Sequence, residues 1–439
     1  MNVAEQIDAF LQKKETPKFP SPVKSFTVLT GYNFTPVSLE TDFFGRPISS
    51  PFLLSAAPPT DGLEQVKKAY EHGWSGAIMK TAFDSLPIHI PAAYMNMFDE
   101  FTYGNCDNVS GHPLDRVCRE LEALIKLYPD RLTGASTGGT VSGRDEQDKA
   151  SWQGNTKKLQ AAGAMAIEYS LSCPQGGEGT EGDIVSQNAE LTAKIIDWVL
   201  ESGDPEVPKL FKLSPAVTDI TTIVKAVKEV FRRYPRSKAG ITLGNTLPCL
   251  VFKPGSKKTW EEGVVVGMSG VGIAAINFLT LAKVSGLDVS VSGNGGPMNY
   301  MQAAHFLALG VKTVQFCTLV EKFGYGIFQE MVSGISHLMA DRGIGSMSEL
   351  IGRALPDPIR DFMELPAEKQ ISTVEEELCV HCGNCTRCPY LAISLDEKKV
   401  PRTEAEKCVG CGMCTFLCFT GALSLRDRTP EEAAALKEG

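Results

Sequence analysis

Eight cysteines near the C-terminus have the spacing of iron–sulfur ligands. The first string is Cys379-Val-His-Cys382-Gly-Asn-Cys385-Thr-Arg-Cys388, and the second is Cys408-Val-Gly-Cys411-Gly-Met-Cys414-Thr-Phe-Leu-Cys418. Three thiolates at such intervals hold one face of a cubane cluster, and the fourth ligand comes from the other string. We therefore predict two [4Fe–4S] clusters, one held by Cys379, Cys382, Cys385 and Cys418, the other by Cys408, Cys411, Cys414 and Cys388. Such a module carries single electrons, so the rest of the chain should hold the site that consumes or supplies them.

Zinc binding and disulfide bonding are the alternatives for these cysteines. Zinc sites usually need four ligands in two pairs, so eight cysteines in two similar strings favour two cubanes. The first string departs from the common bacterial pattern, because two residues instead of three separate Cys385 from Cys388. Either the local turn absorbs this shorter step or that cluster is altered. Phe419 also stands where proline commonly follows the last cysteine of such a string.

The overall composition predicts a soluble cytoplasmic protein. The chain has 439 residues, 43% of them hydrophobic, and a net charge of −9, which disfavours nucleic acid as a partner. Residues 1–20 lack the apolar core of a signal peptide, and no apolar run is long enough to cross a bilayer, so we expect no membrane association. Five further cysteines are expected to be thiols, as in a reducing compartment: Cys106, Cys118, Cys173, Cys249 and Cys317.

Eight repeats of a short apolar strand, a loop and an amphipathic helix follow a predicted hairpin over 37–48. We place the strand starts near Phe52, Ala77, Leu132, Ala166, Leu210, Gly240, Asp288 and Lys312. Predicted helices include 62–71, 113–127, 189–200, 220–231, 299–309 and 319–339, with Asp219 as a candidate cap. Eight such units predict an α/β fold, a closed (β/α)8 TIM barrel. An open doubly wound sheet is the alternative, although no Gly-x-Gly-x-x-Gly follows the first strand.

The predicted domain plan has five parts. Residues 1–36 form an N-terminal extension, 37–345 the barrel, 346–372 a linker, 373–428 a two-cluster module of the bacterial ferredoxin type, and 429–439 a charged tail. We expect the tail to be a solvated helix.

Glycines and polar residues gather at the predicted carboxyl ends of the strands, where TIM-barrel sites lie. Gly295 and Gly296 after the seventh strand would let backbone N–H groups approach a phosphate, unless they only make a tight turn. Lys80 and Lys212 lie at the ends of two other strands, and buried lysines are rare unless paired. A lysine here would stabilise a reduced flavin. An ion pair, for instance with Glu168, is the alternative.

These segments together resemble the dihydropyrimidine dehydrogenase family, and in particular its bacterial NAD-dependent members that have a separate FMN and iron–sulfur subunit. The barrel is also similar to that of the fumarate-using class of dihydroorotate dehydrogenases. The resemblance runs from about Leu39 to the C-terminus. The matching motifs are Lys80-Thr81, Ser172-Cys173-Pro174, Lys212-Leu-Ser-Pro, Asn245-Thr246, Ser269-Gly270, Gly295-Gly296 and the two cysteine strings.

The resemblance implies FMN at the mouth of the barrel and Cys173 as a proton donor. Reduced FMN would give a hydride from N5 to one carbon of an activated C=C bond, as in uracil or thymine, and Cys173 would protonate the neighbouring carbon. The glycine-rich segment 176–182 would be a mobile loop beside that cysteine. A small buried hydrophobe is the alternative role for Cys173. The implied FMN contacts are Ser55, Ala56, Lys80, Thr81, Lys212, Asn245, Ser269, Gly270, Gly295, Gly296, Cys317 and Thr318.

The implied substrate contacts are Asn105, Ser170, Asn245 and Thr246. Ser170 departs from the family, which has asparagine there, and a hydroxyl cannot present a carbonyl and an amide together. A conjugated C=C compound that is not a pyrimidine is therefore an alternative substrate. An electron-transfer subunit without substrate chemistry and an enzyme that oxidises dihydroorotate are further alternatives.

The sequence lacks an evident nicotinamide-binding region. We therefore predict a partner that delivers electrons, either an FAD/NAD(P)-binding subunit or a soluble ferredoxin. The resemblance is compatible with a homodimer or a heterotetramer.

Overall fold

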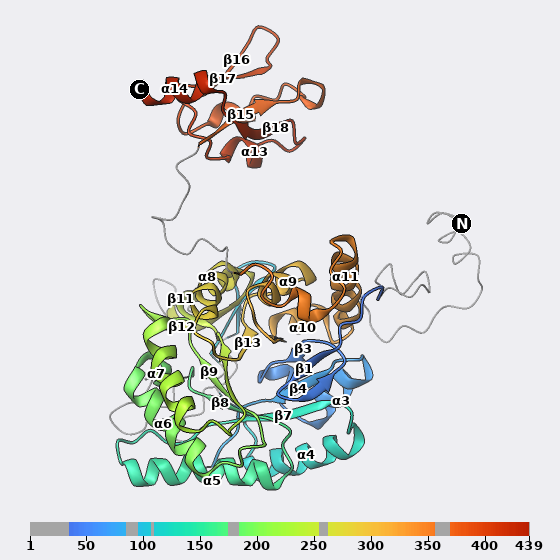
Figure 1. Cartoon of the computed structure of the whole chain (residues 1–439), viewed down its shortest axis with the longest axis vertical. Helices are drawn as coiled ribbons and strands as arrows, with labels where there is room; N and C mark the ends of the chain where they lie inside the picture. Colours follow the sequence, from blue (N-terminus) through green and yellow to red (C-terminus); the bar gives the residue numbers. More distant parts are fainter. Residues whose placement is uncertain are drawn as a thin grey trace, which may run out of the picture. The chain divides into compact units, whose positions relative to one another are not determined.

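A computed structural model describes residues 35–84, 95–106, 109–173, 184–253, 262–355 and 369–438. The chain divides into two compact units, residues 1–358 and 359–439 (Figure 1). This division falls inside the segment predicted as a linker, 346–372. Helix α12 (Met347–Leu350) lies at the start of the predicted linker and packs near α9 in the first unit.

The first unit is a closed barrel of eight parallel strands in the order β10-β13-β14-β3-β4-β7-β8-β9. The predicted TIM barrel is thus confirmed, and seven strands begin within one residue of the predicted positions. The seventh strand begins at Val291 instead of near Asp288, because Asp288 has a left-handed backbone with φ of 54°. The strands are β3 (Phe52–Leu54), β4 (Gly76–Met79), β7 (Leu132–Thr137), β8 (Ile167–Ser170), β9 (Lys209–Leu213), β10 (Ala239–Leu243), β13 (Val291–Asn294) and β14 (Thr313–Phe316).

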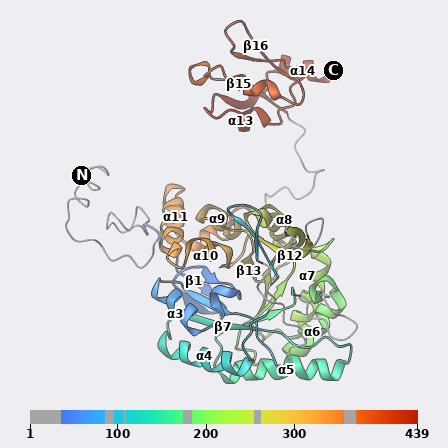
Figure 2. The same cartoon turned by 180° about the vertical axis from the view of Figure 1, so that it is seen from behind.

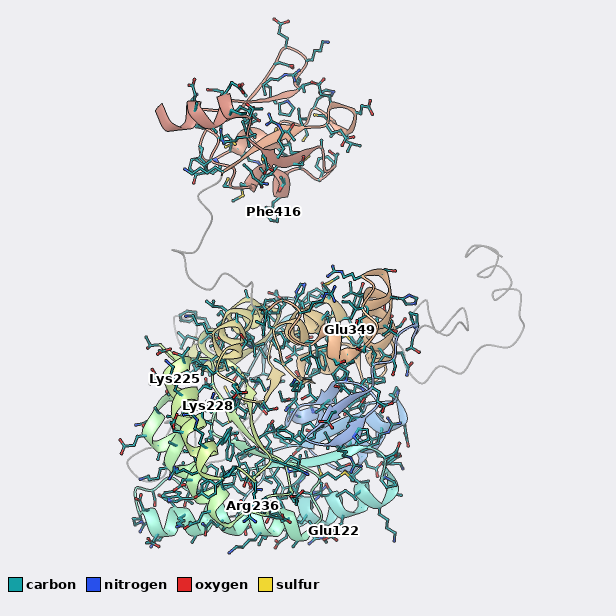
Figure 3. All side chains as sticks on the ribbon, viewed as in Figure 1. Glu122, Lys225, Lys228, Arg236, Glu349 and Phe416 are labelled. Atoms are coloured by element: carbon teal, nitrogen blue, oxygen red, sulfur yellow. The ribbon has the colours of Figure 1, made fainter. Side chains whose placement is uncertain are left out.

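Helices surround the barrel, as Figures 1 and 2 show. Their outer faces carry charged side chains such as Glu122 and Lys225 (Figure 3). The helix predicted over 319–339 is two helices, because Gly324 at φ of 76° separates α10 from α11. The helices are α3 (Leu63–Glu71), α4 (Leu114–Leu127), α5 (Asp145–Ala161), α6 (Ala189–Ser202), α7 (Ile220–Arg233), α8 (Ala274–Ser285), α9 (Tyr300–Ala308), α10 (Thr318–Phe323) and α11 (Ile327–Asp341).

Helix α7 shows how local sequence builds this outer layer. Asp219 caps it, as predicted, and accepts a hydrogen bond from the Thr221 backbone N–H at 2.9 Å. Ile220, Val224 and Val227 are buried at helical spacing against the barrel core. The polar residues between them remain on the outside.

The amino-terminal end of the barrel is closed by the predicted hairpin, now β1 (Thr41–Phe43) and β2 (Arg46–Ile48). Phe43 and Ile48 pack against inward-facing Leu53, Ile78 and Leu132. An apolar layer therefore fills this end of the barrel, and the polar interior lies nearer the carboxyl ends of the strands.

The second unit is small and contains both cysteine strings. Strand β15 (Gln370–Val374) pairs with β18 (Leu423–Asp427), and β16 (Ile393–Leu395) pairs with β17 (Pro401–Thr403). Helix α13 (Met413–Leu417) lies within the second string, and α14 (Pro430–Glu438) forms the predicted terminal helix (Figure 2). The assignment of this unit as a two-cluster ferredoxin module stays a prediction. None of the helices in the described ranges is long and apolar enough to span a membrane.

Candidate active site

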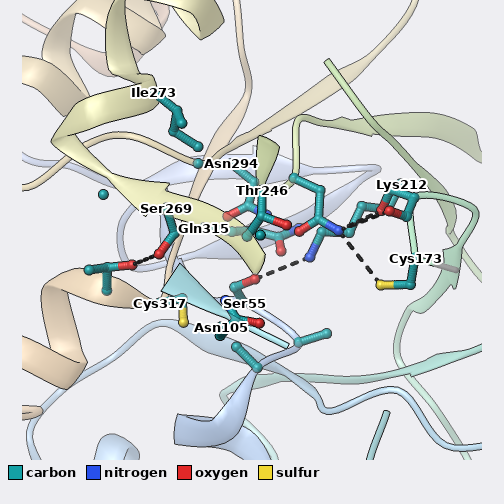
Figure 4. Close-up of a pocket in the computed structure, with 18 of the residues that line it drawn as sticks. Ser55, Asn105, Cys173, Lys212, Thr246, Ser269, Ile273, Asn294, Gln315 and Cys317 are labelled. Carbon is teal, nitrogen blue, oxygen red and sulfur yellow. Dashed lines mark hydrogen bonds between the residues drawn. The ribbon is translucent and has the colours of Figure 1, made fainter. Parts of the chain in front are cut away.

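A cavity of about 520 Å³ lies at the carboxyl ends of the barrel strands. This is the end at which TIM-barrel sites are expected, and the volume is within the range of small-molecule and cofactor sites. Figure 4 shows side chains from several strands and loops converging on it. All of the predicted FMN, substrate and proton-donor residues line this cavity: Ser55, Ala56, Lys80, Thr81, Asn105, Ser170, Cys173, Lys212, Asn245, Thr246, Ser269, Gly270, Gly295, Gly296, Cys317 and Thr318.

A four-stranded antiparallel sheet that we did not predict forms one wall of the cavity. Its order is β11 (Leu247–Lys253), β12 (Glu262–Gly270), β6 (Thr102–Asn105) and β5 (Asn96–Met97). Pairing of β6 with β12 places Asn105 opposite Gly267, and Val264, Val265 and Val266 line the cavity. Runs rich in valine, leucine and phenylalanine over 247–253 and 264–268 carried the signal for these strands.

Lys212 is buried and makes an ion pair. Its Nζ lies 3.5 Å from Glu168 Oε1 and donates a hydrogen bond to Ser55 Oγ at 3.3 Å. The ion-pair alternative is therefore confirmed for this lysine, and the same side chain also lines the cavity. The two interpretations are compatible, because the ammonium faces the carboxylate on one side and the cavity on the other. Lys80 is likewise buried on the cavity wall.

Cys173 is held near an amide donor. Asn245 Nδ2 donates to Ser172 Oγ at 2.9 Å and lies 3.7 Å from Cys173 Sγ (Figure 4). Asn245 lies two residues after the end of β10 and Cys173 follows β8, so the strands on either side of β9 bring these groups together. The predicted loop over 176–182 lies outside the described residues.

The predicted phosphate site combines glycines with tightly packed backbone. Gly295 and Gly296 have φ of 80° and 126°, which favours glycine at both positions. A Cβ on Gly296 would lie 2.7 Å from Ala274 Cα, so only glycine allows this approach. Thr318 Oγ1 donates to Ser269 Oγ at 2.9 Å, which joins the loop after β14 to β12. Burial raises the pKa of the Cys317 thiol well above its usual value, so this thiol stays protonated.

These features fit an FMN-sized ligand. Glycine backbone lies at one part of the cavity and two lysines lie at another, which matches a ligand with a phosphate and a ring that becomes anionic. The apolar valines of β12 match a flat aromatic ring.

The second unit brings the first predicted ligand set together. Cys379, Cys382, Cys385 and Cys418 line one small cavity. Cys388 packs against the small buried cluster that contains Cys408, and both cysteines belong to the second predicted set. All thirteen cysteines of the chain are unbonded, so the disulfide alternative is wrong. Within the described ranges, no group of three or more His, Cys, Asp or Glu side chains is close enough to hold a single metal ion.

The short Cys385–Cys388 step lies in a tight 3₁₀ turn. A 3₁₀ helix over Asn384–Arg387 lets the Cys388 N–H donate to the Cys385 carbonyl at 3.2 Å. The longer second string forms the α-helix α13 at the equivalent place. A 3₁₀ helix has three residues per turn instead of 3.6, so it brings the last cysteine round with one residue fewer.

The chain is similar to known pyrimidine enzymes. It is 29% identical over 366 residues to the NAD-dependent dihydropyrimidine dehydrogenase subunit PreA of Escherichia coli K12, covering 79% of this chain and 84% of the relative. The predicted resemblance to dihydropyrimidine dehydrogenase is confirmed. The chloroplastic dihydropyrimidine dehydrogenase (NADP(+)) of Arabidopsis thaliana is 28% identical over 336 residues, 71% of this chain and 75% of the relative.

The chain is also similar to dihydroorotate dehydrogenases. The catalytic subunit of dihydroorotate dehydrogenase B (NAD(+)) from Pyrococcus abyssi is 26% identical over 320 residues, 72% of this chain and 99% of the relative. No family model matches the chain. The similarity to dihydropyrimidine and dihydroorotate dehydrogenases thus agrees with the position of the cavity at the barrel mouth.

Proposed function

We propose that this chain is an oxidoreductase that uses FMN and two [4Fe–4S] clusters to reduce an activated C=C bond of a pyrimidine such as uracil or thymine. The observation that carries the proposal is the convergence of the glycines, the lysines and Cys173 on one cavity. Similarity to dihydropyrimidine dehydrogenases and the second unit with its two cysteine strings support it.

FMN, when bound, supplies a hydride to one carbon of the substrate. Gly295, Gly296 and Thr318 would hold its phosphate, and Lys80 and Lys212 would stabilise the negative charge of the reduced ring. The eight cysteines Cys379, Cys382, Cys385, Cys388, Cys408, Cys411, Cys414 and Cys418 would hold the two clusters, which carry single electrons.

Cys173 would give the proton that completes the reduction. The S–H bond breaks, a C–H bond forms on the carbon next to the one that accepts the hydride, and a thiolate remains. The Asn245 amide N–H points to this sulfur at 3.7 Å, so it would stabilise the thiolate until solvent returns the proton.

The substrate would contact Asn105, Ser170, Asn245 and Thr246. Ser170 supports a second candidate, a conjugated C=C compound that is not a pyrimidine, because this buried hydroxyl cannot read an imide edge as an asparagine does. Losing that pair of hydrogen bonds would cost pyrimidine binding about 1–3 kcal/mol.

Electrons would come from a separate FAD/NAD(P)-binding subunit or a soluble ferredoxin. The Escherichia coli and Pyrococcus abyssi relatives are each named as a subunit, which supports a larger assembly. Isolated protein should oxidise NADH slowly and gain activity with such a donor; rapid NADH oxidation by the chain alone would contradict this.

The decisive test is Cys173→Ala in anaerobically purified protein. We expect turnover of the C=C substrate to fall by about 10²- to 10⁴-fold, as for loss of a general acid, while FMN stays bound. Cys118→Ala is the matched control, because Cys118 lies on α4 and does not line the cavity. Full turnover in a folded Cys173→Ala sample would remove Cys173 as the proton donor and overturn this mechanism.

Substrate class is tested by reoxidation of the reduced flavin. Uracil, thymine and cyclic enones should be compared in wild type and in Ser170→Asn. A pyrimidine enzyme reoxidises with uracil or thymine, and Ser170→Asn should increase that rate. Reoxidation by enones alone would favour the second candidate.

A further inference from the structure

Glu168 is a fully buried carboxylate in the interior of the barrel, directly behind the cavity. It lies on β8 and has no exposed surface. An isolated buried carboxylate is strongly destabilising, so its surroundings must provide hydrogen bonds and a positive charge. Glu168 has both, and the positive charge is the lysine that lines the candidate active site.

Three barrel strands hold the carboxylate in one orientation. Glu168 Oε2 accepts hydrogen bonds from Thr242 Oγ1 on β10 at 2.7 Å and from Gln315 Nε2 on β14 at 3.0 Å. Gln315 also donates to Ser292 Oγ on β13 at 3.1 Å, which fixes the amide in turn. The orientation of the carboxylate therefore depends on side chains from other strands across the barrel interior and not on solvent.

The other carboxylate oxygen faces Lys212. Glu168 Oε1 makes no hydrogen bond to any described residue, and the Lys212 ammonium lies 3.5 Å away. Ser55 Oγ accepts a hydrogen bond from the same ammonium at 3.3 Å. Lys212 is thus held between a carboxylate behind it and a hydroxyl at the cavity wall.

The ion pair of Glu168 and Lys212 affects the electrostatic potential in the cavity. Its charged lining residues are Lys80 and Lys212, its titratable thiols are Cys106, Cys173 and Cys317, and Glu168 is the acid in contact with Lys212. Charges interact strongly where water is excluded, so a carboxylate behind Lys212 reduces the positive potential that reaches the cavity.

We propose that Glu168 is a positioning residue that holds the Lys212 ammonium at the cavity wall and, by cancelling part of its charge, sets the reduction potential of the bound flavin. The inference rests on the proposed function, because it needs FMN in this cavity. Glu168, which is not among the predicted ligand contacts, would thereby control how strongly the reduced, anionic ring is stabilised.

The first experiment is a redox titration of Glu168→Gln. Glutamine preserves the size and can still accept from Thr242, but it carries no charge. We expect the equilibrium constant for flavin reduction to rise about tenfold, which is about 30 mV for a two-electron couple. Asp148→Asn is the matched control, because Asp148 is also a buried carboxylate held by hydroxyls, those of Thr140 and Ser142, and it does not line the cavity. Its potential should equal that of wild type.

The second experiment uses flavin-free protein and thermal unfolding. Lys212→Met leaves a buried carboxylate without its counter-charge and should lower the melting temperature by about 5 °C. Adding Glu168→Gln to Lys212→Met should restore most of that loss. No restoration would overturn the pairing on which the inference depends.

The outcomes separate the two proposals. Wild-type protein that binds no FMN overturns both the proposed function and this inference. Wild-type protein with bound FMN, together with an unchanged or lower potential in Glu168→Gln, overturns only the inference.

Discussion

The barrel unit and the cysteine unit are stabilised in different ways. The barrel has a continuous apolar core that includes Trp74, Trp152 and Phe306, all fully buried, and its candidate site lies at one end of that core. In the second unit the candidate ligands are part of the core, because Cys385, Cys408 and Cys414 are buried beside Ile371 and a few other small apolar side chains. The barrel should therefore fold without its cofactor, whereas the small unit should need its clusters.

Size explains the difference. A unit confined to residues 359–439 buries a smaller fraction of its surface than the barrel does, so it depends more on disulfides, metals or partners for stability. Apolar side chains around its cysteines also remain exposed, as Phe416 shows in Figure 3, with 87% of its surface accessible. The predictions below test this contrast between a core-stabilised barrel and a cluster-stabilised unit.

Removal of iron should have the largest effect, and only in the second unit. Oxidation of the clusters followed by chelation of the released iron should unfold residues 369–438, because in small metal-dependent units the free energy of metal binding drives folding. The four tryptophans of the chain all lie within residues 1–358, so tryptophan fluorescence reports on the first unit alone. That fluorescence should keep its wild-type melting profile while limited proteolysis degrades the C-terminal unit. If the C-terminal unit still resisted proteolysis after iron removal, its fold would not depend on the clusters, and the proposed difference between the two units would be wrong.

Gly410→Ala should damage one cluster. Gly410 has φ of 70° between two cysteines of the second string, and an added Cβ would collide with the Gln370 carbonyl oxygen. Iron content should fall from about eight to about four atoms per chain, as measured by metal analysis. Gly421→Ala is the control, since its φ is 73° but an added Cβ meets nothing within 4 Å. Equal iron loss in both variants would mean that backbone strain alone is responsible.

Gly296→Ala should weaken FMN binding without unfolding the barrel. An added Cβ would lie 2.7 Å from Ala274 Cα, so the loop must shift at the predicted phosphate site. We expect FMN affinity to fall at least tenfold, which equals about 1.4 kcal/mol, measured by flavin fluorescence with flavin-free protein. Gly324→Ala is the control. Gly324 also has a positive φ, 76°, but an added Cβ would meet no atom within 4 Å, so this variant should retain FMN.

Asp219→Ala should have the smallest effect and should depend on pH. Hydrogen bonds from the Thr221 and Thr222 hydroxyls and the Thr221 N–H lower the pKa of Asp219 to about 2. A carboxyl whose pKa is lowered in the folded state stabilises that state when the pH is above the ordinary pKa of the carboxyl. This contribution is lost as the pH falls toward 2. At pH 7 the melting temperature should drop by about 2 °C, and the difference from wild type should vanish near pH 2. Asp219→Asn keeps the capping oxygen and should be nearly neutral at pH 7.

Much of the barrel could be predicted because its signals are local. The strand starts at Phe52, Leu132 and Thr313 follow closely from short apolar runs, and the site residues follow from the rule that loops after the strands carry function. The antiparallel wall could not be placed in this way. Its strands β6 and β12 are more than 150 residues apart in sequence, and only the closed barrel brings Asn105 opposite Gly267.

Residue types and spacing determined the chemistry that this chain can support: thiolates at cluster spacing, lysines and glycines after barrel strands, and one cysteine beside a strand end. Only the tertiary structure decided which groups meet. It placed the Glu168 carboxylate beside the Lys212 ammonium and the Asn245 amide near the Cys173 sulfur, and it formed the 3₁₀ turn that spans the short cysteine step. The physical reason is that periodicity and propensity act within a segment, whereas charge pairing in a barrel interior depends on the order and register in which distant strands close.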